Sequence, residues 1–205
     1  MYRIFINENQ LTLSSSVFQV EIDKTLEVLH YIGVESIREA IKRAQISSLI
    51  MVSVDLEVMW RDFCSHFKQI DAAGGVILND NRHILWIFRN GKWDLPKGKV
   101  ESKESTMNAA IREVKEECSV DDIRLGPILG KTYHIYRFNG LNILKSSYWY
   151  GMNCSGEQSL KPQIEEGITK VIWADTKQHR KCLTNTYSSI SELLKREKVV
   201  RFLDY

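Results

Sequence analysis

"GKVESKESTMNAAIREVKEEC", residues 98–118, is the stretch that decides what kind of fold this chain adopts. A loop with glycine and lysine leads into a segment whose apolar residues recur three and four positions apart, which is typical of an amphipathic helix. We therefore expect a helix over about residues 105–118. Its buried stripe would consist of Met107, Ile111, Val114 and Cys118.

The same helix carries three glutamates, Glu113, Glu116 and Glu117, on a second face. Side chains at these spacings are neighbours, and like charges there destabilise a helix. One interpretation is an ordinary solvated face. The other is a site for a hard divalent cation, because Mg²⁺ and Mn²⁺ prefer carboxylate oxygens and bridge to substrate phosphates. With Lys97 and Lys99 just upstream, the stretch indicates a site that cleaves phosphoanhydrides.

The order of these residues resembles the Nudix box, G-x5-E-x7-R-E-U-x-E-E-x-G-U, in which U is a bulky aliphatic residue. The matching positions are Gly98, Glu104, Arg112, Glu113, Val114, Glu116, Glu117 and Val120. The one departure is Ser119, where the box has a glycine that can adopt the left-handed conformation. Serine there would cost on the order of 1 kcal/mol, or the helix would end differently. No ligand role is lost with this change, so we do not expect it to abolish activity.

The resemblance extends over residues 69–205, because "AAGGVI", "WDLPKGKVE" and "EEGITKVIWAD" are similar to the corresponding segments of Nudix hydrolases. It implies an α/β fold, an α/β/α sandwich with a mixed sheet, in which the box forms a loop, a helix and a loop. Residues 1–68 lie outside the resemblance. Their own pattern predicts a small N-terminal α/β unit of unknown role, without a chemical motif.

By position, the resemblance implies a role for each residue of the box. Glu113, Glu116 and Glu117 would bind Mg²⁺ or Mn²⁺, assisted by the carbonyl of Gly98. Glu104 and Arg112 would form the ion pair that holds the loop on the helix. The metal ions would neutralise the diphosphate and activate a water for attack on phosphorus.

The general base stays open between two parts of the chain, since members of the family differ. Glu116 or Glu117 could act from the box. Alternatively, Glu165 or Glu166 could act from the polar loop before "GITKVIWA", and the resemblance favours Glu166 of these two.

Arg89, Lys97 and Lys99 are the candidates for binding the substrate phosphates. Arg89 is the strongest of them, because a planar guanidinium binds phosphate oxygens in bidentate fashion. "WDLPKGKVE" looks most like the loop of diadenosine polyphosphate and diphosphoinositol polyphosphate hydrolases. The expected reaction is therefore hydrolysis of a nucleoside diphosphate linked to another moiety, with dinucleoside polyphosphates favoured and ADP-ribose and oxidised nucleoside triphosphates left open.

The remaining elements follow from apolar periodicity and turn residues. In residues 1–68 we expect strands in "YRIFIN", "QLTLSSSVFQV" and "SSLIMVSV", and helices in "GVESIREAIKRAQ" and in "DLEVMWRDFCSHF" with Asp55 as its N-cap. Beyond them we expect strands at 72–78, 83–89, "KTYHIYRFNG", "LNILKSSYWYGMNC" and "ITKVIWA", and a helical end over about 176–198. "RNGKW" predicts a turn, "LPKGK" an irregular loop and 155–166 a polar loop.

The composition of the chain argues against several classes of binding partner. The formal net charge of its 205 residues is +2, which is too weak for a nucleic-acid groove, so no DNA partner is expected. The four cysteines have neither zinc-ligand spacing nor the density of a disulfide scaffold. No apolar run is long enough to span a bilayer, and the start lacks the features of a signal peptide. We therefore expect a cytoplasmic protein with a small phosphorylated substrate.

A second class of function is a Nudix-like ligand sensor that has lost catalysis. In that case residues 1–68 would be an output or dimerisation element. All the glutamates and the arginine of the box are present, which favours catalysis. A homodimer through residues 1–68 is an expectation that the sequence alone leaves open.

Overall fold

The computed structural model describes residues 1–17, 26–156 and 158–204. The chain forms two compact units. We call Met1–Ile70 with Tyr133–Ser146 the N-terminal unit, and Asp71–Thr132 with Ser147–Tyr205 the C-terminal unit. The expected boundary between residues 68 and 69 stays a prediction. The assignment of 133–146 to the N-terminal unit is a feature that the sequence did not indicate.

The N-terminal unit contains a mixed sheet in the order β9-β1-β2-β4-β3. Its own strands are β1 (Tyr2–Ile6), β2 (Asn9–Ser14), β3 (Glu27–His30) and β4 (Leu49–Val52). β1 and β2 form the expected antiparallel hairpin, and β4 runs parallel to both β2 and β3. Residues 133–135 of β9 (Ile123–Phe138) pair in parallel with β1. A strand from a later part of the chain therefore pairs with the first strand of the chain.

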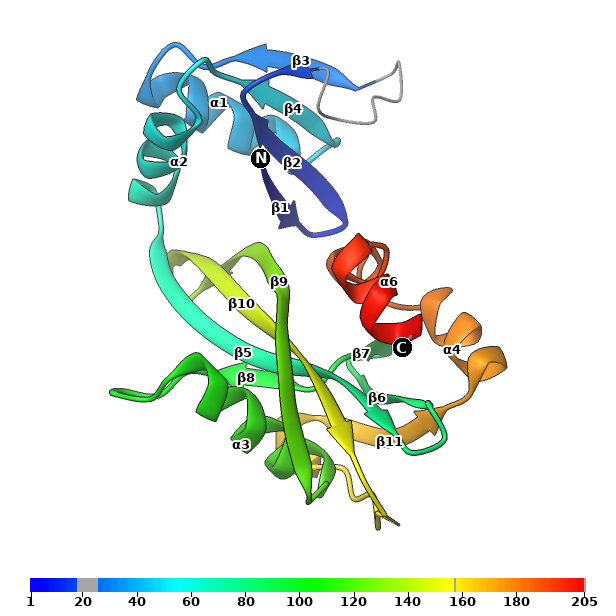
Figure 1. Ribbon diagram of the computed structural model, residues 1–205. Coiled ribbons are helices and arrows are strands. Elements are labelled where there is room, and N and C mark those ends of the chain that lie inside the picture. Colours follow the sequence, from blue (N-terminus) through cyan, green and yellow to red (C-terminus); the bar gives the residue numbers. More distant parts are fainter. Residues whose placement is uncertain (18–25, 157, 205) are drawn as a thin grey trace. The chain divides into compact units, whose positions relative to one another are not determined.

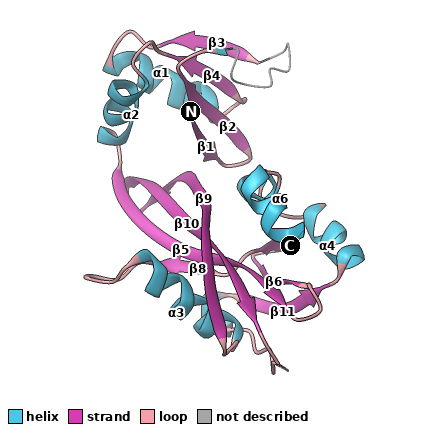
Figure 2. Ribbon diagram, in the orientation of Figure 1, coloured by secondary structure: helices cyan, strands magenta, loops and turns pink. Residues whose placement is uncertain are grey.

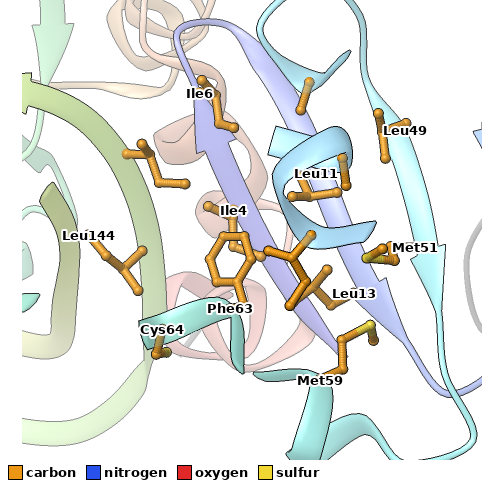
Figure 3. Packing of buried hydrophobic residues seen from close by; sticks show 14 residues of the cluster. Ile4, Ile6, Leu11, Leu13, Leu49, Met51, Met59, Phe63, Cys64 and Leu144 are labelled. Atoms are coloured by element: carbon orange, nitrogen blue, oxygen red, sulfur yellow. The ribbon is translucent and has the colours of Figure 1, made fainter. Parts of the chain in front are cut away.

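Two helices, α1 (Val34–Ala44) and α2 (Leu56–Ser65), cover the core of this unit. α2 begins at the expected N-cap, since Asp55 accepts a hydrogen bond from the Val58 N–H at 3.0 Å. Figure 3 shows Phe63 of α2 among the apolar side chains of β1 and β2. The N-terminal unit thus has a hydrophobic core of its own.

The C-terminal unit is built on a sheet whose strands follow the order β11-β6-β5-β10-β9, with β6 antiparallel to both β11 and β5. Its strands are β5 (Lys68–Asn79), β6 (Ile84–Arg89), β7 (Lys92–Asp94), β8 (Lys97–Lys99), β9, β10 (Leu141–Cys154) and β11 (Ile168–Ala174). β7 pairs with β6, and β8 pairs with β5. The turn between β9 and β10 is Asn139–Gly140, and both residues have positive φ, as a two-residue hairpin turn requires.

Helices cover both faces of this sheet (Figures 1 and 2). Strand side chains alternate between faces, so Leu85 and Ile87 pack with α3 (Thr106–Cys118) on one side. Trp86 and Trp149 pack on the other side with the helical end of the chain, which consists of α4 (Thr176–Leu183), α5 (Ser188–Leu194) and α6 (Glu197–Asp204). The expected α/β/α sandwich with a mixed sheet is confirmed.

Several local predictions differ from the structure. β3 was not expected, and "RNGKW" and "LPKGK" contain the short strands β7 and β8. The helical end is divided into three helices, and the polar loop contains a 3₁₀ turn at Ile164–Glu166. Residues 18–20 of the second expected strand, and residue 157 of the loop, lie outside the described residues. No helix in the described ranges is both long and apolar enough to cross a membrane.

The core of the N-terminal unit generates a stability prediction. Phe63 is fully buried, so Phe63→Ala leaves a cavity and should lower the free energy of unfolding by about 3–5 kcal/mol. Phe138→Ala is the matched control, because Phe138 belongs to the same unit but is 58% exposed, and it should change stability by less than about 0.5 kcal/mol. Urea unfolding followed by circular dichroism measures both. Equal effects of the two substitutions would contradict this packing.

Candidate functional site

Helix α3 carries the glutamates, and its buried face differs from the expected one. Met107 is 48% exposed, so its place in the buried stripe was wrong. The buried residues of the helix are Ala109, Ala110, Val114, Glu117 and Cys118. The small side chains of the two alanines allow the helix to pack closely on the sheet, with its buried arc rotated toward the acidic side. This rotation brings Glu117 into the interior.

Ser119 ends α3 in the left-handed conformation, with φ 54° and ψ 42°. Serine therefore adopts the backbone geometry of the glycine that it replaces. Two carbonyls of the last turn are satisfied from the polar loop, because Lys161 N–H donates to Cys118 O and Gln163 N–H donates to Glu117 O, both at 3.2 Å. These bonds join the end of the helix to the loop that contains Glu165 and Glu166.

The guanidinium of Arg112 is the centre of the acidic face. Nε and Nη2 each donate to Glu104 at 2.9 Å, in bidentate fashion. Nη1 donates to Glu113 at 2.8 Å and to Glu116 at 2.9 Å. Nη2 also donates to the carbonyl of Lys99 at 3.0 Å. One side chain therefore joins the β8 loop, Glu104 and two glutamates of the helix.

Glu104 is held strongly in its charged form. Its pKa is lowered to about 2, first by the hydrogen bonds from Arg112 and then by the N–H of Glu101. The same carboxylates raise the pKa of Arg112 above its ordinary range. The expected ion pair between Glu104 and Arg112 is thus present. Helix α3 starts directly after Glu104, with Ser105 as its N-cap, whose hydroxyl accepts a hydrogen bond from the Asn108 N–H at 3.2 Å.

Gly98 approaches Glu113 closely. A Cβ built on Gly98 would lie 1.9 Å from Glu113 Oε2, so any larger residue at this position would displace the carboxylate of Glu113. β8 therefore passes directly against this carboxylate. Burial raises the pKa of Glu113, while the hydrogen bond from Arg112 acts in the opposite direction.

Glu117 is the most enclosed carboxylate of the site, with 1% of its surface exposed. The backbone N–H of Lys97 donates to its Oε2 at 2.9 Å, and Arg89 Nη1 donates to its Oε1 at 3.3 Å. Burial raises its pKa to about 7, although Lys97 and Arg89 both lower it. Arg89 Nη2 also lies 3.8 Å from Glu166 Oε2. Arg89, at the end of β6, therefore connects Glu117 of α3 with Glu166 of the polar loop.

The two candidate lysines behave differently. The ammonium of Lys97 forms an ion pair with Asp94 and lies 5.8 Å from the ring centroid of Trp149. Lys99 is exposed, and its carbonyl rather than its side chain contacts Arg112. Asp94, which is 3% exposed, was missed from the sequence. An acid flanked by apolar residues and three positions before a lysine was the available signal.

The two helical layers around a mixed sheet define an α/β/α sandwich class of protein, with an acidic loop, helix and loop as its site. The NUDIX domain family matches residues 68–194, more than half of the chain, and the chain belongs to that family. The residues matched begin at β5 and end with α5.

Curated relatives match parts of the same region. The chain is 28% identical over 134 residues to the m7GpppN-mRNA hydrolase of Saccharomyces cerevisiae, covering 60% of this chain and 12% of that protein. It is 35% identical over 72 residues to the RNA pyrophosphohydrolase of Halorhodospira halophila, covering 32% of this chain and 37% of that one. The match therefore spans only a minor part of either relative.

A solved structure supports the fold. The Caenorhabditis elegans Ap4A hydrolase, solved as a binary complex, is similar with a TM-score of 0.50 and 22% identity. The similarity covers 66% of this chain and 98% of that one. Identity at this level shows a shared architecture and carries no information about the substrate.

Nudix hydrolases generally use divalent metal ions, and the donor set of this chain fits them. Carboxylate and carbonyl oxygens are the ligands that Mg²⁺ and Mn²⁺ prefer, and a cation would favour the charged forms of the buried Glu113 and Glu117. Within the described ranges, no three acidic, histidine or cysteine side chains converge as a ready metal site. Arg112 and Arg89 hold the carboxylates instead, so these side chains would have to turn toward an ion.

The left-handed conformation of Ser119 generates a second prediction. Ser119→Gly should raise the free energy of unfolding by about 0.5–1 kcal/mol, because glycine removes the steric cost at positive φ but loses more entropy on folding. Ser119→Ala retains the Cβ and removes only the hydroxyl, so it should give no gain. Thermal unfolding of the three proteins measures the effect. A gain in the alanine variant as large as in the glycine variant would contradict backbone strain as the cause.

The lowered pKa of Glu104 predicts a pH-dependent contribution to stability. Its ionised form contributes fully above the ordinary pKa of 4.5, and the contribution is lost as pH falls toward about 2. Glu104→Gln should therefore be destabilising at pH 7, and its difference from the wild type should shrink between pH 5 and 2.5. Urea unfolding across this range, with the exposed Glu101→Gln as control, measures it. A difference that is independent of pH would exclude the ion pair as its origin.

Proposed function

We propose that this chain hydrolyses a phosphoanhydride bond in a nucleoside diphosphate linked to another moiety, in a reaction that depends on Mg²⁺ or Mn²⁺. The observation that carries the proposal is the assembly of Glu113, Glu116, Glu117 and Glu166 around two arginines beside the glycine loop. In this proposal Glu113, Glu116 and Glu117 hold the metal, together with the carbonyl of Gly98. A metal at this place would neutralise the diphosphate and activate a water.

The residues of the chain have separate tasks in this reaction. Arg112 and Glu104 keep the β8 loop on the helix and so fix Gly98 against Glu113. Arg89 is the phosphate ligand of choice, because its side chain is 24% exposed and its guanidinium reaches from Glu117 to Glu166. A metal that took over Glu117 would leave Arg89 available to bind the substrate phosphates. Lys97, which is ion-paired with Asp94, and the exposed Lys99 would also bind substrate phosphates.

Dinucleoside polyphosphates are the proposed substrate class. The relatives favour one extension of this class, the 5′ end of RNA. The yeast relative is named for m7GpppN-mRNA, and the bacterial relative is named an RNA pyrophosphohydrolase. A cap of the form GpppN is itself two nucleosides joined by phosphates, so capped RNA belongs to this class, whereas 5′-triphosphorylated RNA shares only its phosphoanhydride bonds.

A reducing cytoplasm is part of the proposal and agrees with four cysteines that are all free and buried. A homodimer through the N-terminal unit stays a prediction, and gel filtration with light scattering of the chain tests it. The alternative function is a ligand sensor, in which the same site binds the phosphorylated compound without turnover.

The proposed activity predicts a specific loss in variants. We expect release of phosphate or nucleotide from dinucleoside polyphosphates, or from capped or triphosphorylated RNA, only with Mg²⁺ or Mn²⁺. Glu117→Gln should lower kcat/KM by about 10²–10⁴-fold, the size of several kcal/mol of lost charge stabilisation. Glu101→Gln, an exposed residue in the loop before α3, is the control and should keep full activity. Tight binding of one compound without turnover in the wild type would establish the sensor instead.

The general base can be identified by comparing the activity of Glu166→Gln with that of variants of the box glutamates. If Glu166 is the base, Glu166→Gln should lower kcat while the affinity for metal, measured by calorimetry, stays within about twofold. If the base lies in the box, the same variant should leave kcat unchanged and Glu117→Gln or Glu116→Gln should abolish turnover. Glu165→Gln is the neighbouring control. Loss of both kcat and metal affinity in Glu166→Gln would make Glu166 a metal ligand.

A further inference from the structure

The N-terminal unit contains a cavity of about 340 Å³ that no part of the box lines. It is formed by one side of α1, by the residues that follow α2, and by the turn end of the β9–β10 hairpin. Pockets for small molecules begin at about 300 Å³. The cavity is therefore large enough for a compact ligand.

The charged residues of the cavity are all basic. Arg38 and Lys42 come from α1 at a spacing of four, which places them on the same side of the helix. Arg38 has an acidic partner in Glu35 at 2.9 Å, but the two side chains are 64% and 81% exposed, so this pair is weak. Within the described residues, no ion pair engages Lys42. No Asp or Glu lines the cavity.

The helix ends beside the cavity do not cancel this charge. The partial negative charge of a helix C-terminus resides on its unsatisfied carbonyls. Here Gln45 N–H donates to carbonyls of the last turn of α1, and His66 N–H does the same for α2. These bonds occupy part of the carbonyls at each helix end, and Arg38 and Lys42 carry the formal charges of the cavity wall, which suits an anionic group.

The remaining walls offer an apolar surface and amide groups. Phe67, Ile41 and Ile135 supply the apolar part. Gln45 and Asn142 contribute amides, which can both donate and accept hydrogen bonds, and both residues are exposed. An aromatic ring beside two amides suits a heterocycle that stacks on Phe67 and is hydrogen-bonded at its edge.

His66 also lines the cavity. Its Nε2 is buried and has no hydrogen-bond partner among the described residues. Because this nitrogen is closed to solvent, a ligand in the cavity would lie against other atoms of the residue, so His66 is part of the wall and its ring can report on an occupant.

We propose that this cavity is a second binding site, for a nucleoside monophosphate. Arg38 and Lys42 bind the phosphate, Phe67 stacks on the base, and the amides of Gln45 and Asn142 bind its edge. The site is separate from the box and does not depend on hydrolysis. A nucleoside monophosphate is also a product that cleavage of a nucleoside diphosphate derivative would release, so the N-terminal unit would respond to the yield of such a reaction.

The test measures binding to the full chain in EDTA, where a metal-dependent hydrolase is silent. Calorimetry with the four common ribonucleoside monophosphates should detect at least one ligand, and the corresponding nucleoside and inorganic phosphate should each bind more weakly. Arg38→Gln and Lys42→Gln should each weaken binding by about tenfold, as expected for a hydrogen bond to a charged group. Arg61→Gln, an exposed arginine outside the cavity, is the matched control and should bind within twofold of the wild type.

A second readout does not depend on these variants. The imidazole resonances of His66, assigned by comparison with His66→Gln, should shift on addition of the ligand. The proposal is overturned if no monophosphate binds at millimolar concentration, or if Arg38→Gln and Lys42→Gln bind as tightly as Arg61→Gln. It is also overturned if inorganic phosphate alone matches the nucleotide. Each of these results leaves the proposed hydrolysis untouched, because hydrolysis is assayed separately with metal present.

Discussion

The guanidinium of Arg112 is the interaction on which the arrangement of the site depends. It binds Glu104, Glu113, Glu116 and the carbonyl of Lys99 at 2.8–3.0 Å. Only arginine has enough donors in a fixed plane for these partners. Without it, a half-buried carboxylate would be left without compensation, which is costly. The loop, the helix and the acids are therefore positioned by one planar cation.

A second arginine performs the corresponding task at the opposite end of the helix. Glu117 is buried because the helix packs through Ala109 and Ala110, and a buried carboxylate needs partners. Arg89 and the N–H of Lys97 supply them. Burial still raises the pKa of Glu117 to about 7, so the positive groups around Glu117 only partly compensate the cost of burying its charge. That deficit is the physical reason why a divalent cation suits the site.

The N-terminal unit has its own core and its own chemistry. Residues 133–135 of β9 pair with β1, so a cut of the chain at residue 68 would remove a strand that pairs with this unit. The same hairpin supplies Ile135 and Asn142 to the proposed nucleotide cavity. β9 and β10 therefore belong to both units, and the two functions proposed here share one pair of strands.

The sequence by itself determined the family-defining residues of the box and the principal helices and strands, because periodicity and spacing are local properties of the chain. The α/β/α sandwich was implied only through the resemblance that the box carries. It did not indicate β3, a four-residue strand at the edge of its sheet, because an edge strand with exposed side chains shows no apolar alternation. Only the tertiary structure decided that Met107 is exposed, that Glu117 is buried and that Arg89 lies between Glu117 and Glu166. These features depend on how the helix is rotated against the sheet and on contacts between distant segments, which no local pattern encodes.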